Sequence, residues 1–277
     1  MAPALADVTI CNEERFIPIR LPMEQLTRCS IEAPWETHRG ILKLASNVVE
    51  ARIFIEFDDE TWPDHGDTIP LPNLQRLFVS HSEILAYLSF PVLEELAIQI
   101  YEEDQSEQLD HLQSSLIHSS CPLRRLCFSD WCPDAYDIFD ILIKFPVIVE
   151  LGIIVKDDNA GEAVDNLMET LVVSHSRAVA PQLTCLSFAF GDIGDHSYPD
   201  YELYLKMLKS RWHSERCALT STPLDSDSDR GPAEAALHGL NVLQEEGLDL
   251  VLLNGPDAME VAEEWLFCSQ WNRIPVS

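Results

Sequence analysis

An apolar phrase recurs along this chain and restricts the folds that are open to it. Each copy has an apolar residue, two other residues, a central apolar residue, one other residue and a last apolar residue, often after a proline. The last two apolar residues lie two apart, the spacing of one face of a strand, so each copy predicts a short β-strand. The clear copies have their central and last residues at Leu77 and Val79, Leu96 and Ile98, Leu126 and Phe128, Leu151 and Ile153, and Leu186 and Phe188. Two degenerate copies precede them, at Cys29 and Ile31 and at Ala51 and Ile53.

Helix-like segments separate these strands, at 35–44, 83–88, 106–118, 135–144, 162–174 and 200–211. Alternating strands and helices with right-handed crossovers build a parallel sheet. A repeat of roughly 20 to 35 residues lies at and beyond the upper edge of the leucine-rich-repeat period. We therefore expect an α/β fold, an irregular leucine-rich-repeat solenoid (horseshoe) with a parallel sheet on the concave face and helices on the convex face. A doubly wound α/β domain is the competing interpretation, although it needs no repeated phrase at every strand.

No linker rich in glycine, serine or proline divides the chain, which predicts one domain over 1–277. Its parts are an N-terminal arm (1–17), the repeats (18–219), an acidic loop (220–232) and a C-terminal cap (233–277). The loop is rich in Ser, Thr, Asp and Pro. The cap should contain a helix at 233–246, a strand through Leu248, Leu250 and Leu252, and a final helix at 258–271. Such a cap would cover the last apolar layer of a solenoid.

The charge of the chain excludes several classes of partner. Its 47 acidic and 18 basic residues give a net charge of −29, which repels phosphate backbones and anionic lipids. The most apolar stretch, 138–155, contains Asp140, Lys144, Pro146 and Glu150, and no signal peptide is visible at the start. The eight cysteines are scattered and mostly occupy apolar positions, which favours free thiols. We expect no nucleic acid or membrane partner, and a cytoplasmic or nuclear location.

Catalytic and metal motifs are not evident in the sequence. No nucleophile elbow, P-loop or zinc signature is present, so we assign no catalytic residue, cofactor or metal. Asp225, Asp227 and Asp229 mimic the start of a calcium loop, but arginine and alanine stand at its sixth and twelfth positions. Ser226, with an aspartate three residues later, resembles an acidophilic kinase site. A phosphorylation site and a plain solvated loop both remain open for this segment.

Charged residues precede the central apolar residue of successive strands, and their signs alternate. They are Arg28, Glu50, Arg76, Glu95, Arg125 and Glu150. If the strands pair in sequence order, about 4.8 Å apart, these side chains form a ladder on the face away from the core. Arg52 and Phe78 should flank the ladder on the same face. One interpretation is a ladder that only satisfies its own charges, and the other is a binding site for a protein partner.

The repeats resemble the leucine-rich-repeat regions of large F-box protein families of mushroom-forming fungi. The resemblance covers roughly 18–253 and rests on an ordered series of phrases: LPMEQL (21–26), LPNLQRL (71–77), FPVLEEL (90–96), SCPLRRL (120–126) and EEGL (245–248). In that family an F-box docks on the adaptor of a cullin-RING ubiquitin ligase, and the repeats hold the protein to be ubiquitylated. The resemblance implies a non-catalytic module that binds an unidentified protein.

An F-box is not recognisable in this chain. The phrase at 21–24 superficially matches the start of an F-box helix, but Pro34 follows too soon for a long helical run. Cullin-RING ligase subunits would therefore be partners only if a longer form carries an F-box. The alternative function is that of an α/β enzyme with an unrecognised site.

Overall fold

The computed structural model describes residues 6–10, 22–55, 68–101, 105–130, 132–156, 161–174, 178–190, 200–226 and 232–254. The chain forms two compact units, Met1–Leu123 (the N-terminal unit) and Arg124–Ser277 (the C-terminal unit). Both units combine parallel strands with helices, so the predicted α/β class is confirmed. The sequence predicts one domain over 1–277, which requires the two units to share one core. This stays a prediction.

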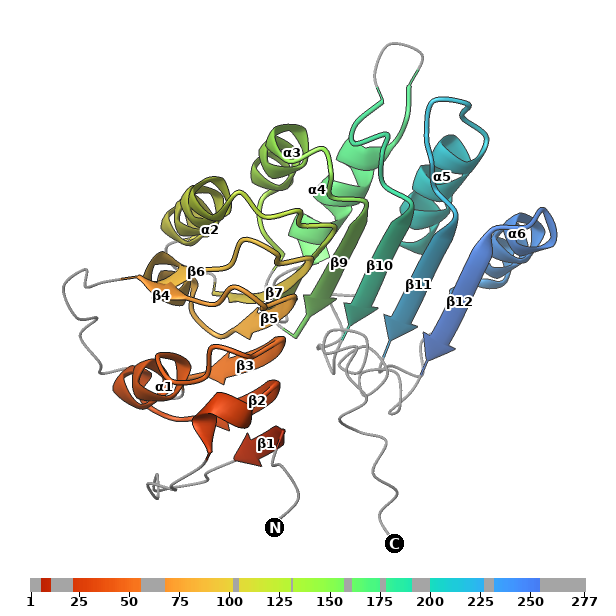
Figure 1. Ribbon diagram of the computed structural model, residues 1–277. Helices are drawn as coiled ribbons and strands as arrows, with labels where there is room; N and C mark the ends of the chain where they lie inside the picture. Colours follow the sequence, from red (N-terminus) through yellow and green to blue (C-terminus); the bar gives the residue numbers. More distant parts are fainter. Residues whose placement is uncertain are drawn as a thin grey trace, which may run out of the picture. The chain divides into compact units, whose positions relative to one another are not determined.

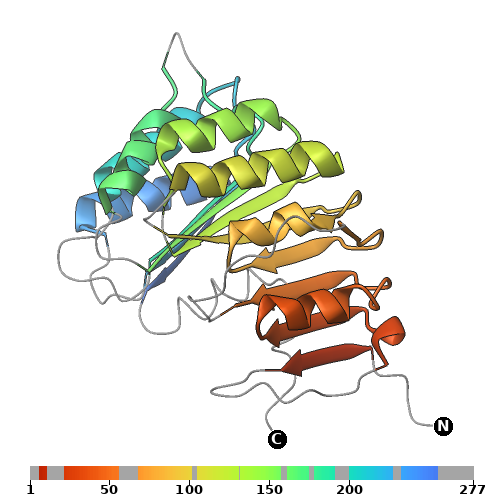
Figure 2. The ribbon, with the colours of Figure 1, turned by 90° about the vertical axis from the view of Figure 1, so that its left-hand side faces the viewer.

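The N-terminal unit contains a parallel sheet whose strands follow in the order β1-β2-β3-β5-β7. These strands are Asp7–Ile10, Arg28–Glu32, Glu50–Phe54, Arg76–Val79 and Glu95–Ile100. The connecting helices are η1 (Met23–Gln25), α1 (Trp35–Leu42), η2 (Ser82–Tyr87) and α2 (Gln105–Ser119). Two short strands, β4 (Ile69–Pro70) and β6 (Leu88–Ser89), form a separate parallel pair. Helix α1 lies against one face of the sheet (Figure 2).

The C-terminal unit is more regular. Its strands are β8 (Arg125–Asp130), β9 (Glu150–Val155), β10 (Cys185–Phe190), β11 (Ser221–Ser226) and β12 (Asp249–Asn254), paired in that order and all parallel. The connecting helices are α3 (Ala135–Lys144), α4 (Gly161–Leu171), α5 (Tyr201–Trp212) and α6 (Glu234–Glu245). These four helices lie on one side of their sheet (Figure 1).

The apolar phrases align in register within each unit. Leu77 lies opposite Leu96 in the N-terminal unit, and Leu151 lies between Leu126 and Leu186 in the C-terminal unit. All five leucines are buried, as the predicted file of core residues requires. The file is therefore confirmed within each unit. The step from Leu96 to Leu126 joins the two units and stays a prediction.

Helix starts follow from local capping. The side chain of Asp134 accepts a hydrogen bond from the backbone N–H of Tyr136 at the start of α3 (2.8 Å). Asp200 does the same for Glu202 (2.9 Å) and Leu203 (3.1 Å) at the start of α5. These carboxylates satisfy backbone donors that have no partner within the helix. The sequence predicts both of these helices to within a residue.

Amide side chains connect the turns that precede neighbouring strands. Asn47 Nδ2 donates to the carbonyl of Glu24 (2.8 Å), and Asn73 Nδ2 donates to the carbonyl of Ser46 (3.2 Å). Each asparagine stands four residues before the central apolar residue of its phrase, so the two bonds are equivalent contacts in successive repeats. They help to fix the register of β2, β3 and β5.

Two predicted segments differ from the structure. The sequence predicts an exposed loop over 220–232, but 221–226 form strand β11, which pairs with β10 and β12. Pairing on both sides overrides the low strand propensity of its Ser, Pro and Asp residues. The predicted N-terminal arm contributes strand β1, parallel to β2. The final helix at 258–271 lies outside the described residues.

Helix α2 is the longest described helix, with 15 residues. No helix in the described part of the chain is long and apolar enough to cross a membrane. The phrase at 21–24, which resembles the start of an F-box helix, leads into the three-residue turn η1 and then into strand β2. A long helical run is therefore not formed there.

Candidate protein-binding face

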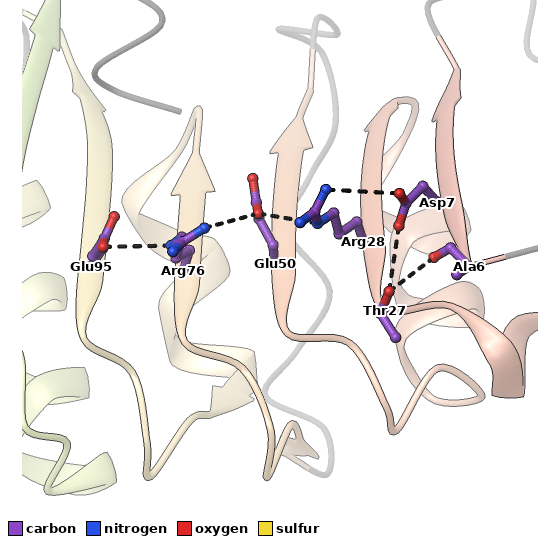
Figure 3. A network of polar contacts seen from close by, with 7 residues as sticks. All are labelled: Ala6, Asp7, Thr27, Arg28, Glu50, Arg76 and Glu95. Atoms are coloured by element: carbon purple, nitrogen blue, oxygen red, sulfur yellow. Dashed lines mark hydrogen bonds and ion pairs between the residues drawn. The ribbon is translucent and has the colours of Figure 1, made fainter. Parts of the chain in front are cut away.

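The predicted charge ladder forms in the N-terminal unit, on the side of the sheet away from the core. The register places Arg28 beside Glu50, Glu50 beside Arg76, and Arg76 beside Glu95. Strand β1 adds Asp7 beside Arg28, a member that sequence reasoning missed because the pattern of 1–17 predicts an arm. Five charges of alternating sign thus follow each other across five strands (Figure 3).

Ion pairs connect all five side chains. Arg28 Nη1 lies 3.8 Å from Asp7 Oδ2, and Arg28 Nε lies 3.7 Å from Glu50 Oε2. Arg76 Nη1 lies 3.5 Å from the same Glu50 oxygen, and Arg76 Nε lies 3.5 Å from Glu95 Oε1. Glu50 is the centre of the ladder, because one carboxylate oxygen serves two arginines. Its side chain is 10% exposed, against 40% for Arg76, so the arginine presents the larger surface to a partner.

A shorter ion pair occupies the same position in the C-terminal unit. Arg125 Nε and Nη2 lie 2.8 and 2.7 Å from Glu150 Oε2. The next residues in this row are Cys185, Ser221 and Asp249, and Ser221 Oγ donates to Asp249 Oδ2 (3.3 Å). The sequence did not reveal this continuation, because the residues are not all charged. The step from Glu95 to Arg125 lies between the two units and stays a prediction.

Arg52 lies in the row next to the ladder and contacts two aromatic rings. Its guanidinium carbon is 5.5 Å from the ring centroid of Phe78 and 5.9 Å from that of Phe54. These are cation–π distances, which favour an ordered arginine. Arg52 itself is exposed. Sequence reasoning missed Phe54, although its position two residues after Arg52 in the same strand was the available signal.

The expected patch of arginine and aromatic character is only partly exposed. Phe78 is 6% exposed, so its ring supports Arg52 rather than offering a surface of its own. In strands β8, β9 and β10 of the C-terminal unit, the residues that alternate away from the helices beyond the first row are also buried, namely Cys127, Ser129, Gly152, Ile154, Ser187 and Ala189. On β12, Val251 of the second row is exposed. Strands buried on both faces have nearly continuous apolar sequences, a signal present in LGIIV and LSFAF. Fewer residues of this face are therefore exposed than predicted, and the charged row is its main exposed feature.

The described cysteines are free, and three of the six, Cys29, Cys127 and Cys132, are buried in the core. Burial raises the pKa of Cys29 to about 12 and raises the pKa of Cys127 and Cys132 still further. A metal site built from three or more His, Cys, Asp or Glu side chains is not found among the described residues. Ser226, the phosphorylation candidate, is the last residue of β11 rather than part of a loop, and Asp227 and Asp229 lie outside the described residues.

Serine–histidine contacts occur at the carboxyl end of β5, an edge where α/β enzymes bind ligands. Ser80 Oγ lies 2.8 Å from His81 Nδ1, and Ser82 Oγ lies 3.2 Å from His111 Nδ1. Ser80 also accepts a hydrogen bond from the backbone N–H of Ile55 (2.9 Å). Both serines are buried, at 0% and 1% exposure. These hydroxyls join β3, η2 and α2, and neither is presented to a substrate.

The fold and this face define an α/β protein of parallel strands whose exposed charged row follows a repeated sequence position. No family model, no curated protein and no solved structure matches the chain. The geometry of the charged row is therefore the feature of this chain that bears most directly on its function.

Proposed function

We propose that this chain is a non-catalytic protein–protein interaction module, built as an irregular leucine-rich-repeat solenoid. The observation that carries the proposal is the in-register ladder from Asp7 to Glu95 on the face away from the core. A repeated apolar phrase, parallel strands in sequence order and helices on one side of each sheet support the solenoid part.

The charged row would select its partner by complementarity. Arginines are enriched at binding hot spots and hold carboxylates in a bidentate way. Arg76 and Arg52 present their guanidinium groups, while Asp7, Glu50 and Glu95 separate the positive charges. A row of alternating charge accepts only a surface with the opposite alternation, and like-charge contacts in any other register are costly. The ladder therefore contributes specificity and orientation more than affinity.

The proposed cellular role follows the resemblance to fungal F-box proteins. The repeats would hold a protein substrate, and cullin-RING ligase subunits would join through an F-box in a longer form. A chain acting in this way belongs in the cytoplasm or nucleus. Affinity purification of the tagged chain followed by mass spectrometry tests this role, since ligase subunits should be recovered with the substrate. Their reproducible absence would remove the ligase part and leave the interaction module standing.

Charge reversal tests the face itself. Arg52→Glu combined with Arg76→Glu should reduce recovery of the main co-purified protein at least tenfold, with little change in Tm. Lys206→Glu combined with Lys209→Glu, on exposed positions of α5, is the matched control, because it changes the net charge equally on the helix side. Equal recovery with both double variants would exclude the ladder as the binding face.

A further inference from the structure

Helix α3 of the C-terminal unit is apolar on two opposite sides. Four side chains on its inner side are buried in the core: Ala135, Ile138, Ile141 and Leu142. Its outer side presents Tyr136 and Ile143, whose exposed fractions are 72% and 58%. A helix that is apolar all round is ordinarily covered on both sides. The outer side of α3 is therefore a candidate contact surface.

The exposed residues of α3 form one stripe along the helix. Tyr136, Asp140 and Ile143 stand at positions i, i+4 and i+7, which share one face of an α-helix. The two apolar residues are about 10 Å apart along the axis, which is two helical turns. Val147, which follows the end of the helix, is exposed as well. This spacing is the one at which the side chains of one helix interlock with those of another.

The other helices of the same unit have different outer sides. Helices α4 and α5 expose charged or amide side chains, namely Glu162, Asn166 and Glu169 on α4, and Glu202, Lys206 and Lys209 on α5. Helix α6 exposes one large apolar side chain, Leu237. Single exposed apolar residues are normal at a protein surface, whereas a set that repeats over two turns indicates a contact surface. Helix α3 is therefore distinguished from its neighbours by this stripe.

The charges around the stripe are mainly acidic. Five carboxylates belong to α3, to its N-cap or to α4, which packs against α3: Asp134, Asp137, Asp140, Glu162 and Glu169. Lys144 is the basic residue of α3. A second copy of this chain would bring its own net charge of −29 to this surface and would be repelled, whereas a basic partner would be attracted.

We propose that the outer side of α3 binds a basic amphipathic helix of a partner protein. Apolar side chains three or four residues apart on the partner pack on Tyr136 and Ile143, and its lysines or arginines lie against Asp140. The apolar contacts supply affinity, and the carboxylates select against acidic helices. Arg125 and Glu150 point away from the helices of this unit, so the charged row and α3 can bind different partners.

A designed peptide tests this surface in the full chain. The probe is a fluorescent helix of about 14 residues with leucine on one face and lysine on the other. Measured by fluorescence anisotropy, its affinity should be at least about tenfold that of two control peptides. One control has the same composition but no apolar face, and the other has glutamate in place of lysine. Equal affinity for the probe and either control, or no binding of the probe, would overturn the proposal.

Removal of the stripe tests its location. Tyr136→Ser combined with Ile143→Ser should weaken binding of the lysine peptide about tenfold, with little change in Tm because both side chains are exposed. Leu44→Ser combined with Leu237→Ser is the matched control, because it removes two exposed apolar side chains from the turn after α1 and from α6. The control should bind as the parent chain does. Equal losses of affinity in the two double variants would show that the peptide does not bind at α3.

Charge reversal tests the basic character of the partner. Asp140→Lys should weaken binding of the lysine peptide and strengthen binding of the glutamate peptide, each about fivefold. Glu245→Lys makes the same change at an exposed position of α6 and should have a much smaller effect. Equal effects of the two reversals would overturn the acidic selection.

Sedimentation velocity at several protein concentrations tests the other occupant, a second copy of the chain. The parent chain should sediment as a monomer. A dimer that becomes monomeric with Tyr136→Ser and Ile143→Ser would show that a second copy covers α3, and it would overturn the proposal.

Discussion

The two units use the same apolar phrase but differ in how strictly they repeat it. In the C-terminal unit every described strand has six residues, and helices of 10 to 12 residues connect them. In the N-terminal unit the strands of the sheet β1-β2-β3-β5-β7 have four to six residues, and the connections range from the three-residue 3₁₀ helix η1 to the 15-residue helix α2. The strand register is nevertheless the same. The apolar phrase therefore determines the register of the strands, whereas the length and type of the helix that connects them can vary.

The faces away from the helices differ as well. In the N-terminal unit this face has an exposed Arg52 and a ladder of five linked charges. In strands β8, β9 and β10 of the C-terminal unit, one short ion pair, Arg125 with Glu150, stands beside a second and third row that are buried. Burial on both sides of a parallel sheet increases the core of the C-terminal unit. We infer that the C-terminal unit contributes more to stability and the N-terminal unit more to recognition.

The largest expected effect is on the core of the C-terminal unit. Leu126→Ala should lower the free energy of unfolding by about 2 to 5 kcal/mol, because it removes a buried side chain that lies opposite Leu151 in the core. Leu77→Ala is the matched change in the N-terminal unit, where the position is 3% exposed. Urea denaturation followed by circular dichroism measures both. A loss no greater than that of an exposed substitution would contradict the register.

The same pair of variants tests whether the two units unfold together. Hydrogen exchange in each variant should show lower protection across both units if the chain is one cooperative domain. Loss of protection confined to the unit that carries the substitution would show two cooperative units. The single-domain prediction from the sequence would then be wrong.

The sequence predicts a strand correctly where a segment contains the apolar phrase, and it misses β11, where the phrase is absent. All seven strands with a copy of the phrase are predicted correctly, because central residues such as Leu151 must be buried at regular intervals. Strand β11 is missed, since its central position is Thr222 and Pro223 follows it. Thr222 is buried all the same, and its hydroxyl lies 2.7 Å from the Tyr204 hydroxyl on α5. The buried Thr222 hydroxyl therefore finds its hydrogen-bond partner 18 residues away in the sequence. A local sequence pattern does not reveal such a partner.

The candidate site is predictable to a similar extent. Alternating charge at one repeat position identifies Arg28, Glu50 and Arg76 from the sequence alone, since the register of the strands follows from the phrase. The depth of Glu50 and the burial of Phe78 are not predictable in this way, because exposure depends on which segments cover the sheet.

The next largest effect concerns pH in the N-terminal unit. His38 is 2% exposed, and its Nε2 lies 3.1 Å from the carbonyl of Phe54. Burial lowers the pKa of His38 to about 4, while hydrogen bonds to the carbonyls of Phe54 and Ala33 oppose this shift. As the pH falls, His38 therefore takes up a proton at a higher pH in the unfolded chain than in the folded chain. The stability from this group is complete above pH 6.5 and decreases as pH falls toward 4.

Between about pH 7.5 and pH 5, this histidine should lower the free energy of unfolding by about 2 kcal/mol. His38→Gln keeps a donor for the Phe54 carbonyl but does not titrate, so its stability should vary less over this window. Urea melts at a series of pH values measure the difference. Identical pH dependence in the parent and the variant would show that folding does not lower the pKa of His38.

Two helical glycines should respond with opposite sign. In α1 of the N-terminal unit, a Cβ at Gly40 meets nothing within 4 Å, so Gly40→Ala should stabilise by about 1 kcal/mol. In α6 of the C-terminal unit, a Cβ at Gly239 would collide with Leu205 Cδ2 on α5. Crowding there should outweigh the helix propensity, giving a net loss of about 1 kcal/mol. Thermal melts measure both, and stabilisation by Gly239→Ala would show that α5 and α6 are packed loosely.

The smallest expected effect compares the ion pairs of the two charged rows. Arg125 and Glu150 are joined through two nitrogens at 2.7 and 2.8 Å, whereas Arg76 and Glu50 are 3.5 Å apart and Glu50 also serves Arg28. The mean exposure of the two pairs is similar, so geometry should decide their strength. Double-mutant cycles with alanine should give a coupling of about 1 kcal/mol for the first pair and about 0.2 kcal/mol for the second. Both should weaken in about 1 M salt, because screening acts on partly exposed charges. A stronger coupling at Arg76 and Glu50 would mean that the nearly buried carboxylate holds the ladder together, and that its arginines are committed to structure rather than offered to a partner.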